Sequence, residues 1–225
     1  MGNLDAAQVN VEYWIDALNR GIVTIATDGS VLDQKGYFAT VVHTDQRQLR
    51  FQGPCDGDSS LMTSYQSELT GILLVLYLLH ALYSYSHTLI TTKQTLHCNN
   101  AAAVSWANAP IPPGIKQYVA TDYDIVKEIT VVKESLIKMQ AEWVKAHQDD
   151  TTELQLLPIQ TQLNVQADAN VTSFRLNTPT NLQPSSMPLK LTSTRATLIV
   201  NNITVTSDLH RIIWDNYLCS DMSRY

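Results

Sequence analysis

The first regular pattern along the chain has a period of two. Ile22, Thr24, Ala26 and Asp28 fall on one face of a β-rich run. Two similar runs follow, at Gly36 to His43 and Gln48 to Gln52. Asp28 is followed by Gly29, a pair that is typical of a turn. The pattern predicts three antiparallel strands, with Asp28 at the end of the first.

After these runs the period changes to that of a helix. Asp58-Ser59-Ser60 can cap a long helix that runs to about Leu82. The elements expected beyond it are a strand from Thr88 to Cys98, a short helix from Asn100 to Asn108, a longer helix from Val119 to Gln140, a strand from Ala141 to Ala146 and a helix from Pro158 to about Leu176. Three antiparallel strands followed by strands joined through helices predict a mixed α/β fold.

Three parts are expected along the chain. Residues 1–20 form an amphipathic leader helix, and residues 21–176 form the core domain. Residues 177–225 form an extension that starts with a Thr-, Asn-, Ser- and Pro-rich linker. Within it, Asn201-Asn202 suits a hairpin turn, and residues 209–218 suit a short helix.

Composition narrows the classes of function. The chain has 225 residues, a net charge of -6 and three cysteines. An acidic chain must hold a polyanion locally or through metal ions. The cysteines are too few for a disulfide framework or a zinc site, which favours an intracellular setting in cytoplasm or nucleus. No signal peptide is visible, and the apolar run from Gly71 to Tyr83 is too short to span a membrane.

Three acidic residues, Asp28, Glu68 and Asp168, are candidates for a shared cation site. Glu68 shares a helical face with Tyr65 and Ile72, so it should face the sheet as a buried charge. Asp28 is equally well explained as a turn former, and Asp168 borders the packed face of the last helix. Neighbouring buried carboxylates repel one another, and a cation that neutralises them makes such a cluster tolerable.

Two polar residues follow strand ends in the same way. Asn99 stands where a fourth carboxylate is expected, although taken alone it is better explained as a helix cap. His147 opens a polar loop, where a surface histidine and a mobile proton shuttle are both reasonable interpretations.

Taken together, the motifs resemble the ribonuclease H domain, in the form fused to reverse transcriptases in retrotransposons, over about residues 20–176. The segments that carry the resemblance are Thr27-Asp28-Gly29-Ser30, Ser67-Glu68-Leu69, Cys98-Asn99-Asn100, Lys145-Ala146-His147 and Asn164-Val165-Gln166-Ala167-Asp168. The resemblance implies a ribonuclease H-like five-stranded mixed sheet flanked by helices. It also implies an endonuclease that hydrolyses the RNA strand of an RNA/DNA hybrid with two Mg²⁺ ions, for which Mn²⁺ can substitute.

The resemblance assigns roles to individual residues. It implies metal ligation by Asp28, Glu68 and Asp168, and at the position of Asn99. His147 would assist proton transfer or product release. Contacts with the nucleic acid would come from Gly29, Ser30 and Asn100.

Asn99 departs from the family, which has Asp at this position. A neutral amide is a weaker ligand for a hard cation, so impaired cleavage is expected. A substitution made to hold substrate without cutting it is favoured over a decayed natural copy, because the other site residues are all present. A catalytically inactive duplex-binding module of a retroelement polyprotein is the alternative function. Double-stranded RNA is the alternative substrate, and a reverse transcriptase domain in the parent polyprotein is an expected partner.

Overall fold

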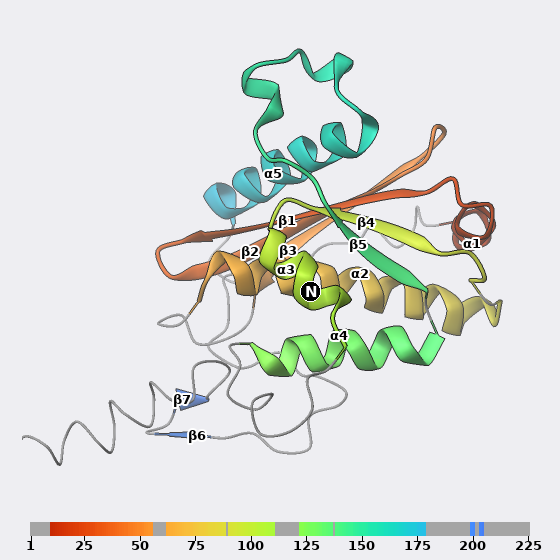
Figure 1. Ribbon diagram of the computed structural model, residues 1–225, viewed down its shortest axis with the longest axis horizontal. Coiled ribbons are helices and arrows are strands. Elements are labelled where there is room, and N and C mark those ends of the chain that lie inside the picture. Colours follow the sequence, from red (N-terminus) through yellow and green to blue (C-terminus); the bar gives the residue numbers. More distant parts are fainter. Residues whose placement is uncertain are drawn as a thin grey trace, which may run out of the picture.

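A five-stranded mixed sheet forms the centre of the fold, in the order β3-β2-β1-β4-β5 (Figure 1). The computed structural model describes residues 10–55, 62–88, 90–110, 122–136, 138–178, 199–200 and 203–204. The antiparallel strands are β1 (Thr24–Leu32), β2 (Lys35–His43) and β3 (Gln48–Cys55). Strand β4 (Gln94–Cys98) runs parallel to β1, and β5 (Met139–Trp143) runs parallel to β4.

Helices cover both faces of this sheet. Figure 1 shows α2 (Ser64–Ser86), α3 (Ala101–Asn108) and α4 (Tyr123–Leu136) on one face and α5 (Ile159–Asn177) on the other. Short 3-10 turns, η4 (Gln148–Asp150) and η5 (Leu154–Leu156), lie in the connection from β5 to α5. The predicted mixed α/β sheet flanked by helices is therefore confirmed.

The first hairpin differs from the prediction. Asp28 does not end its strand, because β1 continues to Leu32 and pairs with β2 along its whole length. The turn lies at Asp33 and Gln34, whose φ values are 49° and 62°. Two successive residues with positive φ suit the tight connection of a twisted hairpin. Asp28 is thus held in the middle of a central strand, which fixes its backbone more firmly than a turn would.

Helix α2 begins later than predicted. Thr63 is its N-cap, and the Thr63 side chain accepts a hydrogen bond from the Gln66 backbone N–H. The predicted cap at Asp58-Ser59-Ser60 lies outside the described residues. With 23 residues, α2 is long and apolar enough to cross a membrane by length and composition, which the shorter run from Gly71 to Tyr83 did not predict. Its Leu69, Ile72, Leu73 and Leu76 are instead buried in the core, as in the central helix of a globular domain.

Other boundaries shift for reasons that the contacts explain. The predicted strand from Thr88 is shortened to Gln94–Cys98, because Thr91 and Thr92 hydrogen-bond to Asn19 and Leu18 at the end of α1. The helix predicted over Val119 to Gln140 ends at Leu136, since Met139 and Gln140 pair with β4. Helix α5 starts directly after Pro158, close to the prediction.

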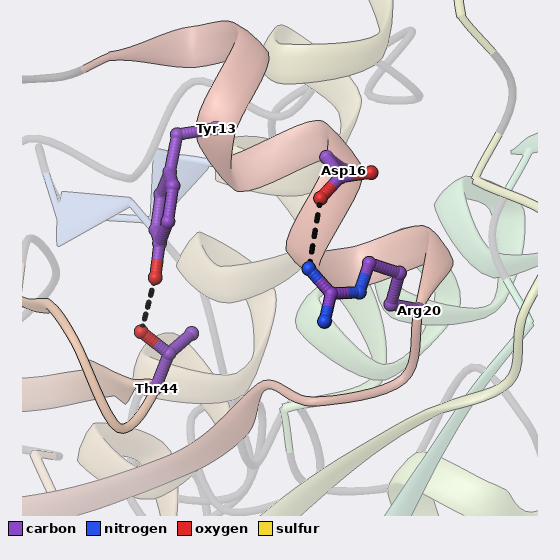
Figure 2. A network of polar contacts seen from close by, with 4 residues as sticks. All are labelled: Tyr13, Asp16, Arg20 and Thr44. Carbon is purple, nitrogen blue, oxygen red and sulfur yellow. Dashed lines mark hydrogen bonds and ion pairs between the residues drawn. The ribbon is translucent and has the colours of Figure 1, made fainter.

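The leader contains the predicted amphipathic helix as α1 (Val11–Asn19), which joins the core through Trp14, Ile15 and Leu18. Figure 2 shows that the Tyr13 hydroxyl bonds to the Thr44 hydroxyl at 2.6 Å, which fastens α1 to the end of β2. The exposed Asp16–Arg20 ion pair in the same view, at 3.4 Å, contributes little to stability.

The extension is described only in part. Strands β6 (Ile199–Val200) and β7 (Ile203–Thr204) pair antiparallel, as expected for a hairpin around Asn201-Asn202. The expected helix over 209–218 and most of the linker lie outside the described residues. The boundaries of the leader, the core domain and the extension stay predictions.

Two glycines set the distance between α2 and β1. A Cβ on Gly29 would lie 2.5 Å from the Glu68 backbone nitrogen, and one on Gly71 would lie 2.3 Å from the Thr27 Oγ1 atom. Either contact is far inside van der Waals distance. Glycine on both elements therefore lets the helix rest against the central strand.

A second group of acidic residues is buried around the start of α4. Asp122 is 1% exposed, and neither of its carboxylate oxygens has a hydrogen-bond partner among the described residues. Burial, followed by the charge of Asp124, raises the pKa of Asp122 to about 7. The neighbouring Glu128 is also buried and accepts a hydrogen bond from the Tyr77 hydroxyl. An unpaired buried carboxylate is costly once it ionises.

Replacing Gly71 with alanine tests the close contact of α2 with β1. We expect Gly71→Ala to lower the free energy of unfolding by about 1–3 kcal/mol through overpacking, although alanine is the better helix former. Thr27→Ala removes the opposing side chain, so the double variant should lose less than the sum of the two single changes. Chemical denaturation of the four proteins measures this, and strict additivity would contradict it.

Asp122 should make stability depend on pH. Because its pKa is higher in the folded chain than the ordinary 3.8, the folded state binds the proton more tightly. Stability is therefore lost as pH rises from about 4 to about 7. We expect Asp122→Asn to be neutral near pH 4 and to stabilise by about 1–3 kcal/mol at pH 8. Denaturation at several pH values measures the difference, and Asp45→Asn, at an exposed position, is the control.

Candidate active site

Asp28 is placed by the alternation of β1. Thr27 and Gly29 contact α2, so Asp28 points to the other face, where α5 packs. Ala26, two residues earlier, packs against Leu163 and Ala167 of α5. Asp28 lies in the middle of the sheet, next to the end of β4, and is only 4% exposed. A carboxylate in this position has little contact with water.

Glu68 approaches from the opposite face. It lies one turn after the start of α2, where Gly29 allows the helix backbone to touch β1, and it is 3% exposed. The Gly29 backbone hydrogen-bonds to its carboxylate. The thiol of Cys98, the last residue of β4, donates to the Glu68 Oε2 atom at 3.5 Å. Glu68 is therefore held by both central parallel strands.

Asn99 is bound directly to Asp28. Its side-chain Nδ2 donates to the Asp28 Oδ1 atom at 2.8 Å. The helix cap is the next residue, Asn100, whose side chain accepts from the Ala103 backbone N–H at the start of α3. The Asn99 backbone carbonyl accepts from the Trp143 indole at 2.9 Å, which ties it to the end of β5. The interpretation of Asn99 as a helix cap is thus wrong, and its side chain belongs to the carboxylate group.

Asp168 and His147 surround the same carboxylate. Asp168 on α5 is partly exposed, and its negative charge acts on both Asp28 and Glu68. His147 follows β5 in a left-handed conformation with φ 52°, and its side chain is exposed. Its charge also acts on Asp28. The fold brings all five predicted residues, which lie far apart in the sequence, within electrostatic reach of one point.

The pKa values show that the two buried acids, Asp28 and Glu68, resist ionisation. Burial raises the pKa of Asp28 to about 7, and the charge of Asp168 adds to the rise. The Asn99 hydrogen bond and the charges of His147 and Arg175 oppose it. Burial, followed by the charge of Asp28, raises the pKa of Glu68 well above its ordinary value. Neither Asp28 nor Glu68 forms an ion pair with any described residue. A positive charge placed here would favour ionisation of both.

The donors have the chemistry that Mg²⁺ prefers. Asp28, Glu68 and Asp168 offer carboxylate oxygens, and Asn99 offers an amide. Over the described part of the chain, however, no three His, Cys, Asp or Glu side chains come together as a group that could hold a metal ion. At Asn99, a neutral side-chain amide donates to one of the two Asp28 carboxylate oxygens. The residues fit a magnesium site by type, and the set lacks a carboxylate at position 99.

The predicted nucleic-acid contacts are already engaged within the chain. The Gly29 backbone bonds to Glu68, and the Asn100 side-chain oxygen caps α3. The Ser30 hydroxyl accepts a hydrogen bond from the Arg175 guanidinium. Their contacts with a nucleic acid stay predictions.

Arg175, Trp143 and Cys98 are site neighbours to which sequence analysis gave no role. Arg175 lies seven residues after Asp168, about two turns along the same helix, and this spacing could have placed it on the same face. Nothing comparable marks Cys98, because a cysteine that ends an apolar strand is an ordinary core residue.

No family model matches the chain, and no curated protein matches it. Solved structures do. The prototype foamy virus protease–reverse transcriptase is 16% identical with a TM-score of 0.50, over 68% of this chain and 20% of that chain. This chain therefore spans one fifth of the length of that protein.

Two ribonuclease H structures are also similar. The PFV ribonuclease H domain is 16% identical with a TM-score of 0.48, over 68% of this chain and 93% of that domain. LC11-RNase H1, isolated from compost by a metagenomic approach, is 12% identical with a TM-score of 0.45, over 68% of this chain and 94% of that chain. At such identities a likeness shows the fold alone. With the element order described above, the fold is ribonuclease H-like.

Proposed function

We propose that this chain is an endoribonuclease of the ribonuclease H type, of the form fused to reverse transcriptases in retrotransposons. Its substrate is the RNA strand of an RNA/DNA hybrid, and its reaction is metal-assisted hydrolysis of a phosphodiester. The observation that carries the proposal is the pair of buried carboxylates, Asp28 and Glu68: the charge of Asp28 raises the pKa of Glu68, and neither forms an ion pair with a described residue. A fold has reason to keep such a pair when a cation completes it.

Each residue of the group has a chemical role in this proposal. Asp28, Glu68 and Asp168 would hold two Mg²⁺ ions, or Mn²⁺. When bound, the metal pair would supply a nucleophilic water and stabilise the leaving oxygen. His147 is exposed in the connection from β5 to α5, so it would exchange protons with the reacting water or the product. Trp143 positions Asn99 through its indole hydrogen bond.

We propose RNA as the substrate because of the proposed reaction, and not because of a contact with RNA in the structure. An RNA strand is told from DNA by its 2′-hydroxyl groups in the wide minor groove. LC11-RNase H1 has been solved in complex with an RNA/DNA hybrid. Double-stranded RNA is the second substrate to compare, because both duplexes present 2′-hydroxyl groups.

A catalytically inactive duplex-binding module is the second candidate function. The Asn99–Asp28 hydrogen bond favours it, because the amide stabilises ionised Asp28 in the way that a cation would. In this case the fold would be kept for its binding surface, for example to space a polymerase domain.

Restoring a carboxylate at position 99 separates the two functions. We expect Asn99→Asp to raise Mg²⁺-dependent cleavage of a labelled RNA/DNA hybrid by at least about a hundredfold, since a lost ligand costs several kcal/mol of transition-state stabilisation. Double-stranded RNA and double-stranded DNA are compared in the same assay. Asn99→Asp/Glu68→Gln is the control and should not cut. Equal rates of cleavage by the unchanged protein and Asn99→Asp would contradict the impairment at position 99, and no cleavage by either protein would contradict the nuclease assignment.

Cation binding should also raise the thermal stability of the protein. The pKa of Asp28 is about 7 in the folded chain, above the ordinary 3.8, so ionisation destabilises the fold as pH rises from about 4 to about 7. Mg²⁺ binds the ionised form, so it should raise the melting temperature at pH 8 and have little effect at pH 5.

Asp28→Asn is the matched control for this thermal shift. It removes the charge and keeps the shape, so the Mg²⁺ effect should disappear. A shift of the same size in Asp28→Asn would place the bound cation elsewhere in the protein.

A further inference from the structure

Arg175 places a positive charge beside the acidic group. It lies in the last turn of α5 and donates through its Nη1 to the Ser30 hydroxyl, two residues after Asp28 on β1. Ser30 and Asp28 lie on the same face of the strand by alternation. The guanidinium thus sits on the α5 side of the sheet, where Asp28 points.

The charge of Arg175 is not neutralised within the described residues. Burial raises the pKa of Asp28 to about 7, and Arg175 is among the charges that oppose this rise, so it lies within electrostatic reach of that carboxylate. It nevertheless forms no ion pair with a described residue. Its Nε is buried without a hydrogen-bond partner. A guanidinium has five N–H donors, and a single neutral hydroxyl uses few of them.

The acidic group creates a problem for any polyanionic ligand. A phosphodiester that approaches Asp28, Glu68 and Asp168 meets like charges in a chain of net charge -6. A nearby cation with planar, forked donors suits a phosphate group better than a lysine would. Arg175 has this chemistry, and it lies on the same side of the sheet as the Asp28 carboxylate.

We infer that Arg175 is a phosphate-binding residue, which holds a backbone phosphate of the nucleic acid next to the candidate active site. The inference rests on the proposed function and deepens it. In the free protein the Ser30 hydroxyl holds the guanidinium in place. In the complex, the phosphate oxygens accept from N–H groups at the end of the guanidinium that the Ser30 hydroxyl does not use.

Salt dependence of binding tests this directly. Binding of a fluorescent RNA/DNA hybrid is followed by anisotropy at several salt concentrations and constant Ca²⁺. Each phosphate contact contributes about 0.7–0.9 to the slope of log Kd against log salt. We expect Arg175→Gln to weaken binding and to lower this slope by about that amount, whereas Arg175→Lys keeps the slope.

A matched variant controls for the loss of charge. Arg20→Gln removes one positive charge at the C-cap of α1, before β1 begins, and should leave the slope unchanged. Melting temperatures of all variants report whether each protein is folded.

The outcomes separate the two proposals. If the unchanged protein binds the hybrid and folded Arg175→Gln keeps the same slope, Arg175 does not bind phosphate and the nuclease proposal stands. An equal loss of slope in Arg20→Gln would also overturn the role of Arg175. If the unchanged protein binds no duplex and Asn99→Asp does not cut, the proposed function fails, and the inference fails with it.

Discussion

The contact between α2 and β1 is the constraint on which the rest of the site depends. Gly29 and Gly71 remove the side chains that would hold the helix away from the central strand. The first turn of α2 therefore lies against the backbone of β1, which carries Glu68 into a space that water barely reaches. Without this close approach, Glu68 would lie further out, where solvent would screen its charge.

The same contact creates the electrostatic cost of the site. Two carboxylates that enter the core from opposite faces of one sheet cannot both ionise easily, and the described residues provide no ion pair for either. The chain stabilises them with polar donors instead: the Asn99 amide on Asp28, and the Gly29 backbone and the Cys98 thiol on Glu68. Burial raises the pKa values of both acids more than these hydrogen bonds lower them.

Strand and helix periods predicted the order of the elements, and the resemblance to ribonuclease H named the residues that the fold brings together. Sequence patterns failed where tertiary contacts decide. Asp28-Gly29 was predicted as a turn, yet pairing with β2 extends the strand past it. Asn99 looked like a cap until Asn100 was seen to fill that role. Arg175 was missed because its importance comes from Ser30, a residue 145 positions earlier in the chain.

The order of the site residues along the chain has a consequence for synthesis. All five strands of the sheet precede α5, and the parallel pairing of β1 with β4 already requires closure of a long loop. Asp168 and Arg175 lie on α5, the last long helix of the described chain. A chain still on the ribosome therefore lacks one carboxylate and the nearby guanidinium of the candidate site until α5 has emerged. The apolar residues of β1 and β2 that α5 covers also stay exposed until then, so one event both completes the candidate site and closes this face of the sheet.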